Sequence, residues 1–289
     1  MKPIRLAAFV AVSALVVAAG CSKGVEQPAP ITRLVIRKVA ADLSKPDPGA
    51  TYWNDVSPGI IKLTAQPMIA PRPESTTTDE IIIQAATDGT RAAFRLRWKD
   101  PEKSEAGRLG EFSDAVALEF PLREGGELPP VFMGGKGNPV HLFHWRAQYQ
   151  RDKEKGKPQV KDIYPNVSVD MYPMEFKEAP GGTPEQREKF SPGVAEGNPQ
   201  SYTKEAVDEI IAEGFSTSAV QAGHGSVAHG EWRAGEWTVV IVRPLSIEGG
   251  SSLKSGGGAN IGLAVWQGGK GEVGARKCVT MQWTPVVIM

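Results

Sequence analysis

Short runs in which apolar and polar side chains alternate constrain the fold of this chain more than any other feature. In the run Ala92–Trp98, three large apolar side chains fall on one face of an extended segment and two arginines fall on the other. A period of two is typical of a half-buried strand. The preceding run Ile81–Ala86 is apolar and β-branched, and Asp88 and Gly89 between the runs form a turn signal. The two runs therefore predict a β-hairpin.

Other segments extend this pattern. The 32 glycines and 23 prolines fit a turn-rich β protein better than a helical one. One helix is predicted over Thr203–Ala212, where Val207, Ile210 and Ile211 fall at helical spacing. We expect a mainly β protein, an antiparallel β-sandwich with one long insertion and one or two short helices. The further strands are expected at Ile31–Val39, Ala115–Phe120, Trp237–Val242, Ile261–Trp266 and Val279–Met289, the last broken by Pro285.

The insertion is the segment 149–200, which is rich in charged residues, proline and glycine. We expect it to leave the sheets as a long loop that is ordered in places near Tyr164 and Tyr172. The remainder of residues 31–289 is expected to form one sandwich domain.

The first twenty residues have the order of an export signal. Lys2 and Arg5 give a positive start, an apolar run covers Leu6–Ala19, and small residues precede Cys21. The run is short for a membrane span, which needs about 20 residues. Residues 1–20 resemble the signal peptide of bacterial lipoproteins, in which the cysteine receives lipid and becomes the new N-terminus. An ordinary cleaved signal followed by a chance cysteine is the alternative.

A lipid on Cys21 would hold the mature chain on the periplasmic side of a bacterial membrane. Residues 21–30 would then be a polar, proline-containing tether. Ser22, in place of an aspartate after the cysteine, favours the outer membrane over the inner one. Acylation of Cys21 also leaves Cys278 unpaired, and we expect this second thiol to be buried and inert.

Charge and motifs narrow the function. The chain has 33 basic and 33 acidic residues, and removing Lys2 and Arg5 with the signal leaves a slight acidic excess. Nucleic-acid binding depends on a basic footprint, which this composition lacks. No phosphate loop and no Gly-x-Ser-x-Gly nucleophile motif occurs, and the absence of Cys-x-x-Cys-His excludes covalent c-type haem.

The four histidines give little support for a metal site. His141 and His144 would point to opposite faces of a strand, so one metal could not easily take both, and we expect structural or hydrogen-bonding roles. His224 and His229 lie in a glycine-rich segment that we interpret as a loop. A zinc site built from these residues is a weaker alternative, because the usual ligand spacing is missing.

A noncovalent haem needs only an apolar slot and one or two axial ligands. Met133 offers a soft thioether, and the paired glycines Gly134 and Gly135 would let a flat macrocycle approach the backbone. Lys277 could bind iron only as a deprotonated amine, which burial favours. By composition alone, ordinary roles are favoured: a core or loop methionine for Met133 and an exposed, solvated lysine for Lys277.

A resemblance to a known family favours the haem-ligand roles of these two residues. Nine short segments occur in a characteristic order over most of the chain: Ala92–Asp100, Phe112–Pro121, Phe132–Gly135, His141–Ala147, Asp162–Asn166, Asp170–Pro173, Ile210–Phe215, Trp237–Val240, and Ala264–Trp266 with Gly274–Lys277. In this order they resemble the haem b-binding gamma subunit of the ethylbenzene dehydrogenase, dimethylsulfide dehydrogenase, and selenate and chlorate reductase group.

The resemblance implies a β-sandwich that binds one haem b through a methionine and a lysine, which map onto Met133 and Lys277. Lys136, His141 and His144 are competing ligands, and Trp145 is a candidate for the haem edge. The resemblance also implies an electron-transfer subunit that is not itself an enzyme. Its partners would be a molybdenum catalytic subunit and an iron–sulfur subunit on one side, and a c-type cytochrome or quinone-linked carrier on the other. The lipid signal departs from the soluble members of the group.

Two other functions stay open at this point. One is a haem-free sandwich module that binds carbohydrate or another ligand, with Trp53, Trp232 and Trp266 as exposed platforms. The other is a scaffold lipoprotein that tethers an enzyme complex to the membrane.

Overall fold

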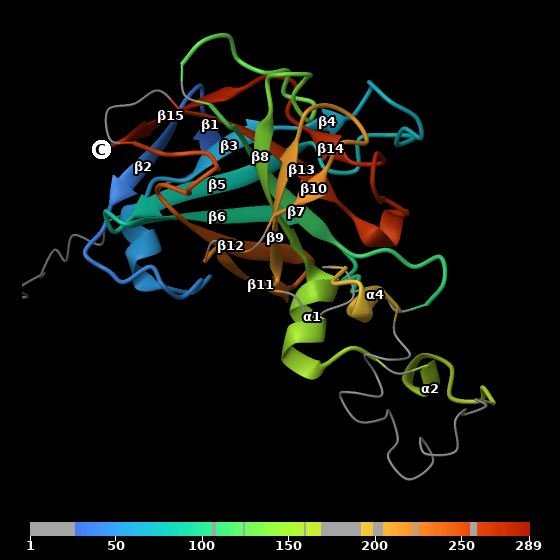
Figure 1. The fold of residues 1–289 in the computed structure, drawn as a ribbon. Helices are drawn as coiled ribbons and strands as arrows, with labels where there is room; N and C mark the ends of the chain where they lie inside the picture. Colours follow the sequence, from blue (N-terminus) through green and yellow to red (C-terminus); the bar gives the residue numbers. More distant parts are fainter. Residues whose placement is uncertain are drawn as a thin grey trace, which may run out of the picture.

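The strands of the chain form two β-layers that cross at a steep angle (Figure 1). This computed structural model describes residues 27–105, 108–123, 125–158, 160–168, 192–198, 205–221, 223, 225–254 and 259–289. The export signal, Cys21, Tyr172 and His224 lie outside the described residues. Within them, the sandwich predicted from the alternating runs is confirmed.

The first layer has the strand order β15-β2-β5-β6-β12-β11, with β3 beside the first half of β5 and β1 beside β3. The predicted hairpin is its centre, formed by β5 and β6. Its strands are β1 (Ala29–Pro30), β2 (Leu34–Lys38), β3 (Gly59–Lys62), β5 (Glu80–Thr87), β6 (Arg91–Lys99), β11 (Val227–Arg233), β12 (Glu236–Pro244) and β15 (Thr284–Ile288).

The second layer has the order β10-β9-β8-β7-β13, with the short strands β14 and β4 beside β13. Its strands are β4 (Thr64–Ala65), β7 (Ala115–Pro121), β8 (Val140–Arg146), β9 (Val207–Ala212), β10 (Ala219–Val220), β13 (Ala259–Trp266) and β14 (Cys278–Val279). Most neighbours in both layers are antiparallel, but β1 with β3, β15 with β2 and β2 with β5 are parallel.

Strand β13 connects the two layers. Its first residues, 259–261, pair with β15 of the first layer, whereas 262–266 pair with β7 of the second. The sandwich is therefore closed along this side by a strand that belongs to both sheets, which fixes how the second layer lies over the first.

The space between the layers is filled by apolar side chains from both sheets. Trp98, Trp145 and Trp237 contact one another there, with ring centres 5.0 to 6.4 Å apart. Phe94, Leu96 and Trp98 point into this core, as the alternation of their run predicts. Such aromatic contacts contribute about 0.5–1.5 kcal/mol each beyond the burial of their area.

The predicted helix over Thr203–Ala212 is wrong, because its described part contains the strand β9. This strand lies between β8 and β10, and nearly all its side chains are buried. A strand covered on both faces shows no alternation, so its apolar residues can fall at helical spacing by chance. Pairing with two neighbours decides the structure here, over the local pattern.

The final strand also differs from its prediction. Pro285 lies inside β15, and the break falls at residues 280–283, between β14 and β15. On the β2 side the missing N–H removes no hydrogen bond, because β15 pairs with β2 only from Val286 onward; on its other side Pro285 lies opposite Asn260 of β13.

Short helices lie at the margins of the sheets. The 3-10 helices are η1 (Thr51–Asp55) and η4 (Gly268–Lys270), and the segment predicted as an insertion contributes α1 (Ala147–Lys155), α2 (Val160–Ile163) and α4 (Pro192–Ala195). Helices α1 and α2 project beyond the sandwich (Figure 1). The amide of Gln150 in α1 accepts Gly230 N–H at 2.7 Å and donates to Gly230 O at 2.9 Å, which fixes α1 against β11.

Two further sequence predictions concern this framework. Cys278 is free and fully buried, as expected. His229 lies in β11 and not in a loop, 3.5 Å from the carboxylate of Glu154. In the part of the chain that the structure describes, no helix is long and apolar enough to span a bilayer.

One end of the sandwich contains two neighbouring buried carboxyl groups, Asp100 and Asp114. Asp114 also accepts the Trp237 indole N–H at 3.0 Å and the N–H groups of Ser104 and Gly268 at 2.6 and 2.8 Å. Burial, and then the nearby Asp114 charge, raise the pKa of Asp100 to about 8. The pair therefore retains a proton in the folded protein at neutral pH.

This retained proton predicts a pH dependence of stability. The unfolded chain releases the Asp100 proton near pH 3.8 and the folded chain only near 8, so this pair contributes less stability as the pH rises through that window. The variant Asp100→Asn stays neutral, so its stability relative to the wild type should increase by more than about 1 kcal/mol between pH 5 and pH 8. Urea unfolding at both pH values measures this change. The exposed control Glu248→Gln should show none, and parallel curves for Asp100→Asn and the wild type would refute the prediction.

Candidate functional site

A cavity of about 400 Å³ lies on the face of the second layer that points away from the sandwich core. Strands β7, β8, β9, β13 and β14 form its floor. Three surface segments wall it: 66–70, 131–133 and 215–218. The segment 274–277, which leads into β14, closes the remaining side.

Strand register explains why this face is hollow. Val279, Ala264, Ala117 and His144 lie side by side across β14, β13, β7 and β8. The next row on this face has Glu119 of β7 in its middle, with Gly262 of β13 on one side and Leu142 of β8 on the other. Ala264 and Ala117 in the middle of the first row, and Gly262 at one side of the second, leave space that larger side chains would fill.

The structure brings the two predicted haem ligands together in this cavity. Met133 lies in the segment between β7 and β8, and Lys277 immediately precedes β14. Both side chains line the cavity. The Lys277 Nζ lies 3.8 Å from the Met133 Sδ and 4.9 Å from the centre of the Trp266 ring. A thioether and an amine from segments far apart in sequence thus face each other over an apolar floor.

Backbone contacts hold Met133 in an unusual conformation. Its φ is 71°, in the left-handed region that side chains other than glycine rarely adopt. The Met133 C=O accepts the Gly214 N–H at 2.8 Å. Ser216, on the wall that follows Gly214, also has a positive φ of 66°. Such conformations cost roughly 1–3 kcal/mol and concentrate at binding sites.

Electrostatics couple Glu119 to Lys277. Burial raises the pKa of Glu119 to about 8, although the Lys277 charge and the Met133 N–H both oppose this rise. Burial lowers the pKa of Lys277, while the Glu119 charge opposes that change. Burial therefore makes it easier for Lys277 to lose a proton and reach the neutral form that can bind a metal.

One side of the cavity is polar. The His144 ring stacks on Trp266 with ring centres 4.6 Å apart. Arg146 lies beside His144 in β8, with its Nη2 3.5 Å from His144 Nδ1, and donates to the Tyr149 hydroxyl at 2.8 Å. The guanidinium is the cationic group on this side of the cavity lining and is suited to carboxylate groups.

The competing ligands lie elsewhere, apart from His144. His141 faces the other side of the sheet, fully buried, with its Nδ1 3.1 Å from Ser251 Oγ and its Nε2 3.8 Å from Glu209. The expectation that the two histidines of β8 point to opposite faces is met. Lys136 is exposed and outside the cavity lining. Among the described residues, no group of three His, Cys, Asp or Glu could hold a metal ion.

Two residues considered for the haem surroundings do not line this cavity. Trp145 lies in the sandwich core and does not line the cavity. Gly134 does not open the backbone toward the cavity, because a Cβ there would lie 2.9 Å from Asn138 O and 3.1 Å from Ala212 O. Its role is to let this segment pack against the ends of β8 and β9.

Glu119 was missed from the sequence. It is the one polar residue in the run Ala115–Phe120, and its outward position in an alternating strand is typical of a solvent-facing residue. Its burial arises from the walls, which come from distant parts of the chain. The role of Ala117 and Ala264 was missed as well. Their small side chains indicate a cavity only when the strand register shows that they lie side by side.

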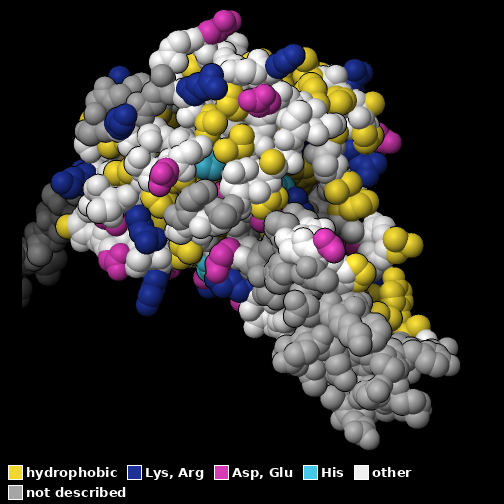
Figure 2. Space-filling view, viewed as in Figure 1, with side chains coloured by type: hydrophobic (Ala, Val, Ile, Leu, Met, Phe, Trp, Pro, Cys, Tyr) yellow, Lys and Arg dark blue, Asp and Glu magenta, His cyan; other side chains and the backbone are white. Residues whose placement is uncertain are grey.

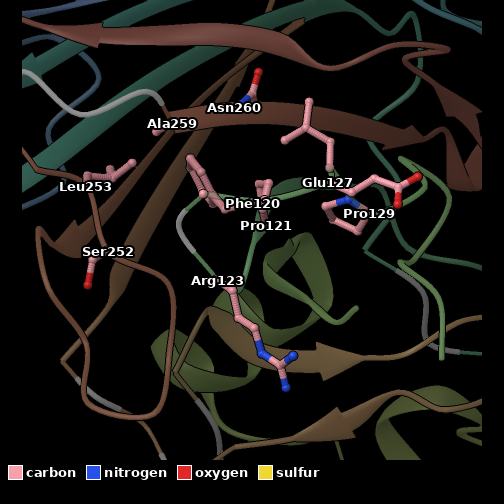
Figure 3. Close-up of a pocket in the computed structure, with 12 residues that line it drawn as sticks. Phe120, Pro121, Arg123, Glu127, Pro129, Ser252, Leu253, Ala259 and Asn260 are labelled. Atoms are coloured by element: carbon pink, nitrogen blue, oxygen red, sulfur yellow. The ribbon is translucent and has the colours of Figure 1, made fainter. Parts of the chain in front are cut away.

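A second cavity, of about 240 Å³, lies at the other end of β7 (Figure 3). Phe120 and Pro121 line it from β7, Ala259 and Asn260 from β13, and Arg123 extends away from its centre. None of its lining residues is a histidine, methionine, cysteine or lysine, so it offers no axial ligand of the predicted kind.

The tryptophans considered for carbohydrate binding do not form exposed platforms. Trp53 and Trp266 are buried, and Trp232 is half-buried with its indole N–H donating to Asp100 O at 2.9 Å.

Two relatives match most of this chain in sequence. A candidate haem subunit of a respiratory nitrate reductase from Haloferax mediterranei is 24% identical over 88% of this chain and 72% of its own length. The chlorate reductase subunit gamma of Ideonella dechloratans is 25% identical over 98% of each chain.

Among solved structures, a carbohydrate binding module family 9 domain from Caldicellulosiruptor kristjanssonii, in complex with glucose, overlaps 89% of this chain and 95% of its own. The identity is 9% and the TM-score 0.40, which supports no inference about a ligand.

The family model described as ethylbenzene dehydrogenase matches residues 50–278. This range contains Met133 and the strands that form the cavity floor, except for the last residue of β14. The chain belongs to the ethylbenzene dehydrogenase family.

Proposed function

We propose that the protein is a haem-binding electron-transfer subunit of a molybdenum oxidoreductase complex, without catalytic activity of its own. The family match and the names of the two relatives, a haem subunit and a gamma subunit of reductases, support this proposal. The single structural observation that carries it is the meeting of Met133 and Lys277 over one cavity.

The residues of the cavity fit a noncovalent haem b. A thioether and an amine make a neutral, nitrogen- and sulfur-based donor pair for haem iron. Burial lowers the pKa of Lys277, which helps the amine to lose its proton. The small side chains of Ala117 and Ala264 leave room above the sheet, and Leu142, Ile210 and Val279 supply apolar contacts.

Each group of residues then has a distinct role. Met133 and Lys277 would be the axial ligands. Phe132, Leu142 and Ile210 exclude water from the apolar part of the cavity, and Arg146 would meet the carboxylates of the haem. A haem bound in this way supplies a one-electron carrier with no open coordination position, so substrate chemistry belongs to another subunit.

The partners follow from this role. We infer a molybdenum catalytic subunit and an iron–sulfur subunit on one side of the electron path, and a c-type cytochrome or quinone-linked carrier on the other.

The exposed apolar side chains Met68, Phe215 and Val273 belong to the segments that wall the cavity, or adjoin them. Exposed apolar groups of this kind are commonly covered by protein partners. The face seen in Figure 2 carries scattered charges of both signs and no large basic patch.

Replacing either ligand should change the haem spectrum. In Met133→Ala and Lys277→Ala the iron loses one axial ligand, so the low-spin electron paramagnetic signal should be largely replaced by other species. Haem affinity should fall by at least about tenfold. The exposed control Lys136→Ala should match the wild type. Unchanged spectra in both ligand variants would refute the ligand assignment, and a wild type that stays colourless after expression with ample haem would refute the proposed function.

Filling the cavity should prevent haem uptake without changing the ligands. Ala117→Phe places a ring at the centre of the floor, at a cost of about 1–3 kcal/mol in stability. Far-ultraviolet circular dichroism should report a folded β protein, while haem titration should show no binding. Ala117→Ser, which keeps the small volume, is the matched control and should bind normally. Haem binding by a folded Ala117→Phe variant would place the haem elsewhere.

We further propose that Cys21 carries lipid and holds the protein on the periplasmic side of a bacterial membrane, with the outer membrane favoured. The small residues before Cys21 and the serine after it support this location. Cys21→Ser should abolish incorporation of labelled fatty acid and shift the mature protein from the membrane to the soluble fraction. A Cys278→Ser control should remain membrane-bound and labelled. Equal labelling of the wild type and Cys21→Ser would contradict lipidation at this site.

A further inference from the structure

We propose that Thr77 is a positioning residue for Lys277: its hydroxyl fastens the chain on both sides of the lysine and so sets where the amine lies over the cavity. The inference rests on the proposed role of Lys277 as a haem ligand. Neither Thr77 nor the two side chains that its hydroxyl contacts belong to the cavity lining, so an effect on the haem must pass through the lysine.

The chain that leads to Lys277 is rich in glycine. Residues 267–277, here called the lysine segment, connect β13 to β14 and contain glycine at positions 268, 269, 271 and 274. Gly271 and Gly274 have positive φ values of 73° and 59°. Glycine gives a free chain more conformations than other residues do, so this segment needs bonds to outside groups to hold one of them. A metal ligand on it depends on those bonds, because its geometry must be held within about 0.5 Å.

The Thr77 hydroxyl meets this chain at two points. It donates a hydrogen bond of 2.7 Å to the carboxyl group of Glu272, in the middle of the lysine segment. It also lies 3.3 Å from the thiol sulfur of Cys278, the residue directly after the lysine. Glu272 and Cys278 are buried, with exposed fractions of 2% and 0%, so water competes little for these contacts.

The groups beside this hydroxyl add to the same fastening. Thr78 N–H donates to Cys278 Sγ at 3.5 Å. At the start of the lysine segment, the Gln267 side-chain amide donates to Thr77 O at 3.2 Å and to Thr78 Oγ1 at 2.9 Å. The Gln267 N–H donates to the other carboxyl oxygen of Glu272 at 2.8 Å, which closes this part of the segment into a loop. The chain is therefore tied to the two threonines before, within and after the lysine segment's glycine-rich part.

Two backbone acceptors carry this restraint to the lysine. The Trp266 indole N–H donates to Gly274 O at 3.0 Å, and the Gln66 N–H donates to Lys277 O at 3.0 Å. Residues 66–79 form one connection between β4 and β5, so the lysine backbone is bound to the same stretch of chain that supplies the hydroxyl. Loss of the hydroxyl frees the chain on both sides of the lysine and leaves its amine less well placed for the iron.

The test uses the mature protein loaded with haem. Thr77→Val removes the hydroxyl at nearly unchanged volume, and Thr77→Ser keeps it. The matched control is Thr87→Val, because the Thr87 hydroxyl also makes two hydrogen bonds, to Arg91 O at 2.7 Å and from Gly89 N–H at 3.0 Å, in a turn outside the cavity lining. The readouts are the electron paramagnetic spectrum of the ferric haem, the rate of haem loss, and amide hydrogen exchange of residues 267–278 in the haem-free protein.

The proposal predicts that Thr77→Val weakens the lysine ligand in particular. Part of its low-spin signal should be replaced by the species that Lys277→Ala produces, and not by the species of Met133→Ala. Haem loss should be about tenfold faster, and hydrogen exchange of residues 267–278 should be faster as well. Thr77→Ser and Thr87→Val should match the wild type in all three readouts. A folded Thr77→Val variant with the wild-type spectrum and haem loss would overturn the proposal, even where exchange is faster, and so would the Met133→Ala species.

The remaining outcomes are also decisive. If Thr77→Val does not fold, Glu272→Gln decides, because its amide oxygen replaces a carboxyl group that accepts two hydrogen bonds on separate oxygens. The Lys277→Ala species in that variant supports the proposal, and a wild-type spectrum overturns it. If the wild type binds no haem, the proposed function fails and the positioning role fails with it. If the wild type binds haem but Lys277→Ala leaves the spectrum unchanged, the lysine ligand and the positioning role fail while haem binding stands.

Discussion

The structure depends on a sheet that is buried on both faces. Strand β7 directs Val116, Leu118 and Phe120 into the sandwich core and directs Ala117 and Glu119 into a second, hollow environment. An ordinary sandwich exposes the outer face of each sheet to water. Here three surface segments and the residues before β14 cover that face, and the small side chains beneath them leave a cavity. Everything proposed about haem binding follows from this second buried face.

The cavity is assembled from parts of the chain that are remote in sequence. Met133 enters between β7 and β8, Ser216 follows β9, and Lys277 precedes β14. The link from Gly214 N–H to Met133 O joins two of these segments, and Gln66 N–H donates to Lys277 O to join two more. Hydrogen bonds between walls, and not a continuous element, keep the two candidate ligands opposed. A rigid floor with interlinked walls suits a cofactor that must hold its geometry in two oxidation states.

The sequence predicted the fold where local patterns are strong. The hairpin of β5 and β6 has both alternation and a turn signal, so its existence and facing were predictable. Strand β9 was not, because burial on both faces removes the alternation that distinguishes strands from helices. Met133 and Lys277 were identified by resemblance alone, since neither has a distinctive local pattern. Glu119 was inaccessible to sequence reasoning, because its burial is produced by tertiary structure.

The most direct test of this account is the position of the iron. A crystal structure of the mature protein with haem, with iron located by anomalous scattering, shows which face of the second layer carries the cofactor. The account predicts iron between Met133 Sδ and Lys277 Nζ, over Ala117 and beside Trp266. Iron bound at His141 inside the sandwich, at the cavity near Arg123, or with any other pair of axial ligands would contradict it.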